Sequence, residues 1–417
     1  MEESLSIMIK TKSSAIRKIC TSILFNCIQN IPFSEKLMEK ILLKLLNNLD
    51  FPEREGKLAS ASVLRKLIQK LPLEILKSKI DLIGLTMITK AVNESNYLVK
   101  EELVEGLSNF LERLNSSEDF SSSITNFENY CGKFLMENEV ETQRAGILLL
   151  NCIIKGKVNF KRQKKCIEKI IEILNEVKDN VKNFYLKLEE DQELDALLKQ
   201  TLWKDVSFQE GEDQCLINLK KTKMMVYDIL VLFSDIVNVM ALEGNRNSED
   251  YGMIIKPILE LKDHPDEDIQ MKALEKVSYW YSNENTIEFV AKYLKQTLMI
   301  IFAGLKSNAC FKDWFLKKIY PINSILFDEM AKNVPTLKLS YFKAINGIMA
   351  SKLKNFHKNV KVFEKGLLVY QQVLENFVQD KFNSQEMQEI LETIIKLQQN
   401  GNIQEDKELS LNIELVR

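Results

Sequence analysis

The chain has 417 residues, with 57 Lys and Arg against 59 Asp and Glu, a net charge of −2 and a pI near 6.0. This balance excludes a globally basic nucleic-acid-binding protein but leaves room for a local basic patch. The 13 Gly and 7 Pro are too few for the frequent turns of a β-sandwich or β-barrel. With 45% hydrophobic and 28% charged residues, the composition is that of a folded globular protein.

Residue types that carry chemistry are sparse and scattered. The two histidines, His264 and His357, exclude a histidine-rich metal site, and the seven cysteines include no Cys-x-x-Cys pair. We interpret the cysteines as buried reduced thiols and both histidines as solvated surface residues. No Gly-x-Gly-x-x-Gly, Gly-x-Ser-x-Gly or His-Glu-x-x-His motif occurs, and the three Gly-Lys pairs lack the Ser or Thr of a phosphate loop. We therefore expect no enzyme activity, cofactor, metal or small-molecule substrate.

Apolar residues recur with the helical period from the first segment onward. A first helix is expected near residues 14–29, and no polar capping repeat precedes it, so we expect a longer array or a docked partner. Further helices are predicted by apolar stripes at residues 37–46, 58–71 and 103–114. Short turns between these helices place successive helices side by side and antiparallel.

The helices recur with a constant period. Ile31-Pro32 is repeated forty residues later as Leu71-Pro72, and three polar turns end at residues 57, 100 and 143, spaced by 43 and 43. A similar acidic turn ends at Gln270. A period of about 40–47 residues made of two helices is typical of HEAT and armadillo repeats. We predict an all-α fold, an α-solenoid of HEAT/armadillo-like helical hairpins, over the alternative of one irregular helical domain.

The composition also suggests where the array is interrupted. We expect HEAT-like repeats over residues 1–180, an irregular helical segment with an acidic insertion over 181–250, HEAT-like repeats over 251–400 and a frayed tail over 401–417. The Ser-rich stretch at 115–126 is predicted to be an exposed loop. No signal peptide is visible at the start. The most apolar stretch, residues 224–242, contains Asp228 and Asp235, so we interpret it as a buried helix with two polar positions and expect no membrane partner.

One basic cluster stands out from the background. Residues 155–169 hold seven Lys and Arg against one acid. Several of these cations are predicted to occupy the first turn of a helix, where the helix dipole disfavours them and a phosphate ligand would offset the penalty. We name six candidate RNA-binding residues: Lys155, Lys157, Lys161, Arg162, Lys164 and Lys165. A contact with RNA or an acidic partner, a solvated loop and a nuclear-import signal remain equal alternatives.

The first 170 residues resemble a known family through the segments at 31–37, 47–51 and 55–60, the turn at Leu71-Pro72, and the apolar helix and basic loop at 145–157. The family is the large nucleolar scaffold of the small-subunit processome, associated with the U3 small nucleolar RNA and named for "down-regulated in metastasis" (DRIM). The similar part is its HEAT-repeat region. This sequence departs from the family pattern at Ile31, Phe51 and Lys57, where the family has an aromatic residue, Tyr and Arg.

The resemblance implies a non-enzymatic scaffold in ribosome biogenesis, acting in small-subunit processome assembly and 18S rRNA processing. It implies binding to pre-ribosomal RNA or U3 small nucleolar RNA and to ribosome-assembly proteins, in the nucleus and nucleolus. The alternative is a HEAT or armadillo protein–protein adaptor or transport factor with no RNA role.

Overall fold

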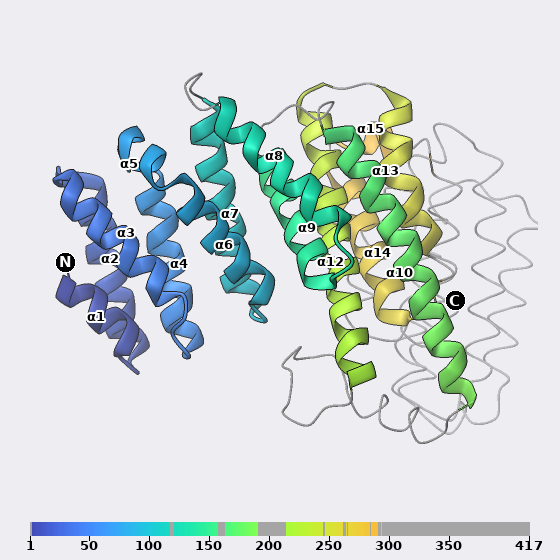
Figure 1. The fold of residues 1–417 in the computed structure, drawn as a ribbon, viewed down its shortest axis with the longest axis horizontal. Helices are drawn as coiled ribbons and strands as arrows, with labels where there is room; N and C mark the ends of the chain where they lie inside the picture. The colour runs from blue at the N-terminus through green and yellow to red at the C-terminus, as the bar shows by residue number, and fades with distance from the viewer. Residues whose placement is uncertain are drawn as a thin grey trace, which may run out of the picture. The chain divides into compact units, whose positions relative to one another are not determined.

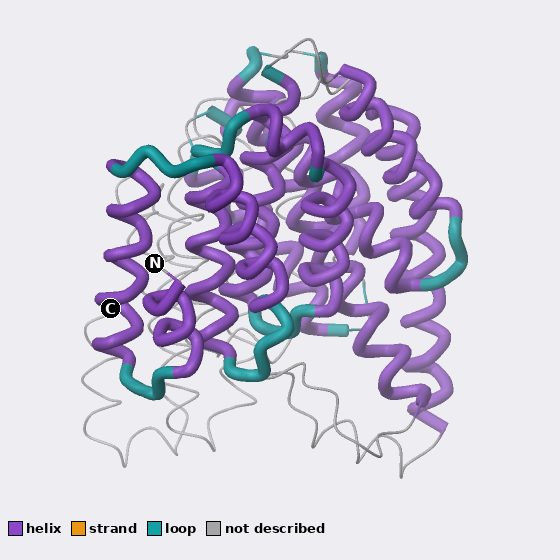
Figure 2. The backbone as a smooth tube through the Cα atoms, turned by 60° about the vertical axis from the view of Figure 1, so that its left-hand side comes forward, coloured by secondary structure: helices purple, strands orange, loops and turns teal. Residues whose placement is uncertain are grey.

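The computed structural model describes residues 2–116, 121–156, 163–190, 214–244, 247–261, 264, 266–283, 285–290 and 293. Within these ranges every regular element is a helix, so the predicted all-α fold is confirmed. The chain divides into two compact units, Met1–Met240 and Ala241–Arg417. Among the described residues the helices are joined mainly by short loops (Figure 2).

Most of the described helices belong to the first unit. They are α1 Glu2–Lys10, α2 Ser14–Asn30, α3 Glu35–Asn48, α4 Arg54–Ile68, α5 Leu73–Ser78, α6 Ile80–Asn93, α7 Tyr97–Asn115, α8 Ser121–Met136, α9 Val140–Lys155, α10 Lys164–Glu190 and α12 Gln214–Leu242, the last two residues of which fall in the second unit. The second unit begins with α13 Ser248–Glu260, α14 Glu267–Ser282 and α15 Ile287–Val290.

The helix starts reproduce the period predicted from the polar turns. Helices α4, α7 and α9 begin at Arg54, Tyr97 and Val140, which are spaced by 43 and 43 residues. The turn before α7 supplies a true cap, because the Asn96 side chain accepts a hydrogen bond from the Val99 backbone N–H. In Figure 1 the helices from α1 to α9 follow one another broadly in chain order. The first unit is therefore a solenoid of helical hairpins.

Ion pairs link neighbouring repeats at separations slightly shorter than the period. Each joins a cation to a carboxylate 37 to 40 residues away. These pairs are Lys57–Glu94, Arg65–Glu102, Lys79–Glu39 and Lys90–Asp50. Partly exposed pairs of this kind contribute about 0–1 kcal/mol each. They show that successive repeats lie side by side in the array.

The core of the first unit is the apolar stripe that the helical period predicts. On α7 the predicted residues Leu103, Leu107, Phe110, Leu111 and Leu114 are all buried. The predicted Ser-rich loop at 115–126 was too long. Helix α8 already begins at Ser121, because Ile124 and Phe127 reach the core from its first two turns and stabilise the helix through packing.

The second unit corrects one expectation. His264 is buried rather than solvated, and its Nδ1 accepts a hydrogen bond of 3.0 Å from the backbone N–H of Asp266. The Asp266 side chain in turn caps α14 by accepting from the N–H groups of Asp268 and Ile269. His264 is thus a buried part of the turn that precedes α14. The acidic residues around it in the sequence did not indicate this burial.

The predicted internal boundaries are only partly covered by described residues. The boundary at 180 falls inside α10 and that at 250 inside α13, whereas the structural division comes after Met240. Most of the acidic insertion, the repeats predicted beyond residue 293 and the tail at 401–417 lie outside the described residues. The predicted domain division as a whole therefore stays a prediction.

Candidate interaction surfaces

The structure places the six predicted RNA-binding residues in three different situations. Lys157, Lys161 and Arg162 lie outside the described residues. Lys155 ends α9, and its ammonium lies 3.1 Å from the Asp235 carboxylate of α12. Burial is the largest single effect and lowers the pKa of Lys155, but the attraction of and hydrogen bond to Asp235, with smaller contributions from Cys152 and Glu105, together leave that pKa above its usual value. This pairing leaves little of the Lys155 charge for a ligand.

Lys164 and Lys165 match the prediction better. They are the first two residues of α10, both are exposed, and the first turn of that helix holds no acidic residue. Helix N-termini favour anions through their unpaired N–H groups and the helix dipole. Two adjacent cations at this position are therefore stabilised when an anion binds beside them.

A hollow of about 500 Å³ between α8 and α10 gathers further cations next to this helix start. Three lysines line it, Lys133 of α8 and Lys165 and Lys169 of α10. We call this cavity the basic hollow. Its one acidic lining residue, Glu128, accepts a hydrogen bond from the buried side chain of Gln163. Sequence reasoning missed Lys133, because it lies on another helix and its Gly-Lys pair was considered only as a failed phosphate loop.

A second surface is apolar. Ile16, Ile19 and Ile23 of α2 are exposed, with 60% of Ile19 accessible, and we call these residues the α2 stripe. Their spacing of three and four residues aligns them along one side of the helix. The neighbouring side of α2 carries Cys20, Leu24 and Ile28 into the core. The helix is thus apolar over two adjoining faces, of which the structure covers one.

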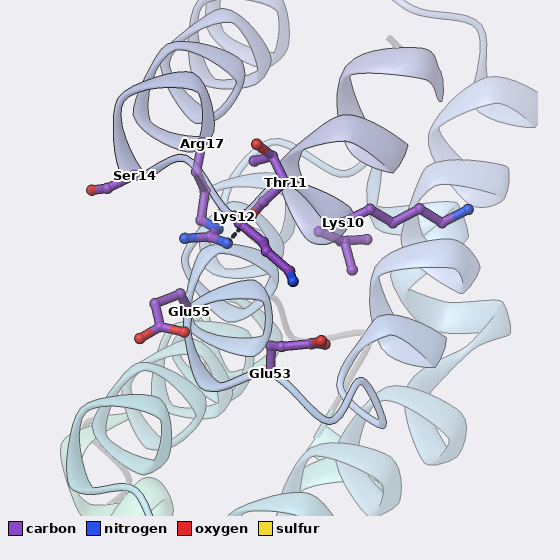
Figure 3. Close-up of a pocket in the computed structure, with 8 residues that line it drawn as sticks. Lys10, Thr11, Lys12, Ser14, Arg17, Glu53 and Glu55 are labelled. Atoms are coloured by element: carbon purple, nitrogen blue, oxygen red, sulfur yellow. Dashed lines mark hydrogen bonds between the residues drawn. The ribbon is translucent and has the colours of Figure 1, made fainter.

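A smaller opening of about 350 Å³ lies beside the α1–α2 turn (Figure 3). Its lining mixes charges, with Lys12 and Arg17 on one side and Glu53 and Glu55 on the other. Arg17 is committed within the fold, since it donates hydrogen bonds to the carbonyls of Thr11 and, at 3.2 Å, Met8. These bonds satisfy the end of α1, so we attribute a structural role to this opening.

Among the described residues of the first unit, one ion-pair cluster is buried between helices. Asp228 of α12 is buried and pairs with two cations, Lys100 of α7 and Arg144 of α9, the Arg144 Nε lying 2.9 Å from its carboxylate. Lys221 of α12 pairs with Glu141 of α9 nearby. Among the described residues, the stretch Ile217–Leu242 of α12 is long and apolar enough to cross a membrane by length and composition alone, and 61% of its apolar window is buried. Its Asp228 is placed as expected for a buried helix with polar positions.

The sequence comparisons give no relative: no family model and no curated protein matches the chain. Solved structures match at low similarity. Kap95 in a complex with Nup1 gives 11% identity and a TM-score of 0.31, covering 100% of this chain and 58% of that one. Kap121p bound to Ste12p gives 10% and 0.36, and Kap121p bound to RanGTP gives 14% and 0.29, each covering 100% of this chain and 43% of the other.

The chain spans about half the length of these matched structures. At scores this low the similarity carries no inference about function. The functional argument therefore depends on the residues of this chain.

Proposed function

We propose that the chain is a non-enzymatic helical-repeat scaffold that binds other proteins through helix faces of its first unit. The observation that carries this proposal is the α2 stripe. Fully burying an isoleucine side chain contributes about 1.5–3 kcal/mol, and each of these three isoleucines, which are 44–60% exposed, leaves roughly half of that contribution unused. Exposed apolar residues that form a patch mark interaction sites, whereas scattered ones do not.

The packing inside the unit indicates what kind of partner fits. Helix α4 is covered on one side by α1 and α2 and on the other by α7, while the main packing partners of α2 are α1 and α4. The stripe is therefore the kind of face that the next hairpin covers elsewhere in the array. The occupant we propose is a helical pair of another protein, stacked on α2 in the manner of one more repeat.

Site-specific photo-crosslinking from position 19 tests this proposal in cells. We expect crosslinks to a helical segment of another protein, and we expect Ile23→Glu to weaken that contact about tenfold or more by placing a charge in the apolar interface. The matched control carries the crosslinker at Leu82, an exposed residue of α6 outside the stripe. No excess of product at position 19 over position 82, or crosslinks to a second copy of this chain, would contradict the proposal.

The second candidate is a scaffold of small-subunit processome assembly that binds pre-ribosomal or U3 small nucleolar RNA and assembly proteins in the nucleolus. The specific observation in its favour is that Lys164 and Lys165 are both exposed at the start of α10, where Lys165 also lines the basic hollow. RNA phosphates bound here would offset the unfavourable interaction of these cations with the helix dipole, about 0.3–1 kcal/mol each.

Charge reversal separates the two candidates. For RNA binding, the triple variant Lys133→Glu, Lys164→Glu, Lys165→Glu should weaken affinity and reduce the slope of log K against log salt concentration by about 2, since about three phosphate contacts are lost. The control is Lys18→Glu, Lys36→Glu, Lys70→Glu, which makes the same change in net charge at exposed lysines of α2, of α3 and of the turn after α4. Equal effects of the two triple variants would leave only non-specific electrostatics and reject the RNA site.

A further inference from the structure

Two cysteines face one another where α8 and α10 pack together. Cys131 of α8 is fully buried, and Cys166 of α10 is part-exposed in the wall of the basic hollow. The two side chains are close enough that each shifts the pKa of the other. The Cys131 thiol donates a hydrogen bond of 3.3 Å to the backbone carbonyl of Gly146. Cys166 is therefore open to solvent molecules, and Cys131 is a buried thiol close to it.

The environment assigns different chemical roles to the two thiols. The interaction with Cys131 lowers the pKa of Cys166, while the same interaction and then burial raise the pKa of Cys131 well above its usual value. Glu128 acts on both and opposes ionisation. The thiolate is the nucleophile in thiol chemistry, so Cys166 is the residue that attacks and Cys131 the one that resolves.

We propose that Cys166 is a thiol-oxidation site and that Cys131 and Cys166 form a reversible disulfide that ties α10 to α8. The oxidant class is a small-molecule disulfide, such as glutathione disulfide, which the hollow of about 500 Å³ admits to Cys166. The Cys166 thiolate attacks one sulfur of that disulfide, which forms a mixed disulfide and releases one thiolate. Cys131 then loses its proton and attacks the Cys166 sulfur, which releases the second thiolate. Overall, two protein thiols and one small disulfide give one protein disulfide and two small thiols.

The crosslink has a structural consequence at the basic hollow. It fixes the first turns of α10, which carry Lys165 and Lys169, to the helix that carries Lys133. It also closes a long stretch of chain between two helices, and such closure stabilises the folded state relative to the unfolded one. Oxidation is therefore expected to raise the melting temperature of the full chain by a few degrees.

The test treats the full chain with glutathione disulfide, blocks the remaining thiols and maps disulfides in a non-reducing digest by mass spectrometry. The expected product links the peptides of Cys131 and Cys166, has lost two hydrogen atoms and is reversed by dithiothreitol. Cys131→Ser should stop at a mixed disulfide between Cys166 and glutathione, whereas Cys152→Ser, which changes a buried cysteine with no thiol neighbour among the described residues, should behave as the wild type.

Two outcomes would overturn the proposal. One is a wild-type chain that stops at the mixed disulfide on Cys166, because the two sulfurs then cannot reach bonding geometry. The other is a Cys166 that stays unmodified while the part-exposed Cys27 reacts, because the hollow then gives no access. The mapping is made on the wild-type chain, so neither result depends on the folding of a variant.

Discussion

Replacing Asp228 with Asn is expected to lower the free energy of unfolding of the full chain by about 3–5 kcal/mol. The Asp228 carboxylate is 7% exposed and balances two cations, and the Arg144 side chain is only 3% exposed. Asn keeps the size of the side chain but removes the charge, so the Arg144 guanidinium stays buried without a counter-charge. Urea unfolding followed by circular dichroism measures the change.

Two further variants separate this charge effect from general damage. Glu172→Gln removes an ion pair in which Glu172 is 63% exposed, so its loss should stay within about 1 kcal/mol. The double variant Asp228→Leu, Arg144→Met removes both buried charges, and we expect it to lose less stability than the sum of the two single changes. If Asp228→Asn and Glu172→Gln cost the same, the buried pair does not hold α12 in place.

The repeat architecture could be predicted because its signals are local. The starts of α4, α7 and α9 keep the spacing of 43 residues, since each is set by a polar turn next to an apolar helix. The burial of α12 could also be predicted from the sequence, because an apolar segment that contains two aspartates fits a protein interior better than a bilayer.

The partners of charged side chains could not be predicted, because they come from distant parts of the chain. Asp228 meets Lys100 and Arg144, which precede it by 128 and 84 residues. Lys155 looked like an open cation within a basic run, but Asp235 approaches it from α12. A run of like charges in sequence therefore says little about which of its members remain available, since tertiary packing decides that.

Phe127→Ala is the second change for which we expect a large effect, a loss of about 3–5 kcal/mol in the free energy of unfolding. The Phe127 ring is fully buried and lies edge-on to Phe110, with 6.2 Å between ring centroids and an interplanar angle of 84°. It also lies over Gly84 of α6, where an added Cβ would be only 2.5 Å from the ring atoms Cε1 and Cζ. Removing the ring leaves a cavity between α6, α7 and α8.

Because Gly84 contacts Phe127, the prediction can be tested through the effect of Gly84→Ala on stability, which should change sign when the Phe127 ring is removed. In the wild type, Gly84→Ala should lower stability by about 1–3 kcal/mol, because the new methyl group overlaps a ring that is held on both sides. In the Phe127→Ala background the same substitution should be neutral or stabilising by up to about 1 kcal/mol, since alanine favours the helix and fills part of the cavity. Gly132→Ala on α8, where a Cβ would meet no atom within 4 Å, should give that small gain in both backgrounds. An unchanged cost of Gly84→Ala after the ring is removed would show that α6 needs glycine for another reason, and that the ring does not rest on this position.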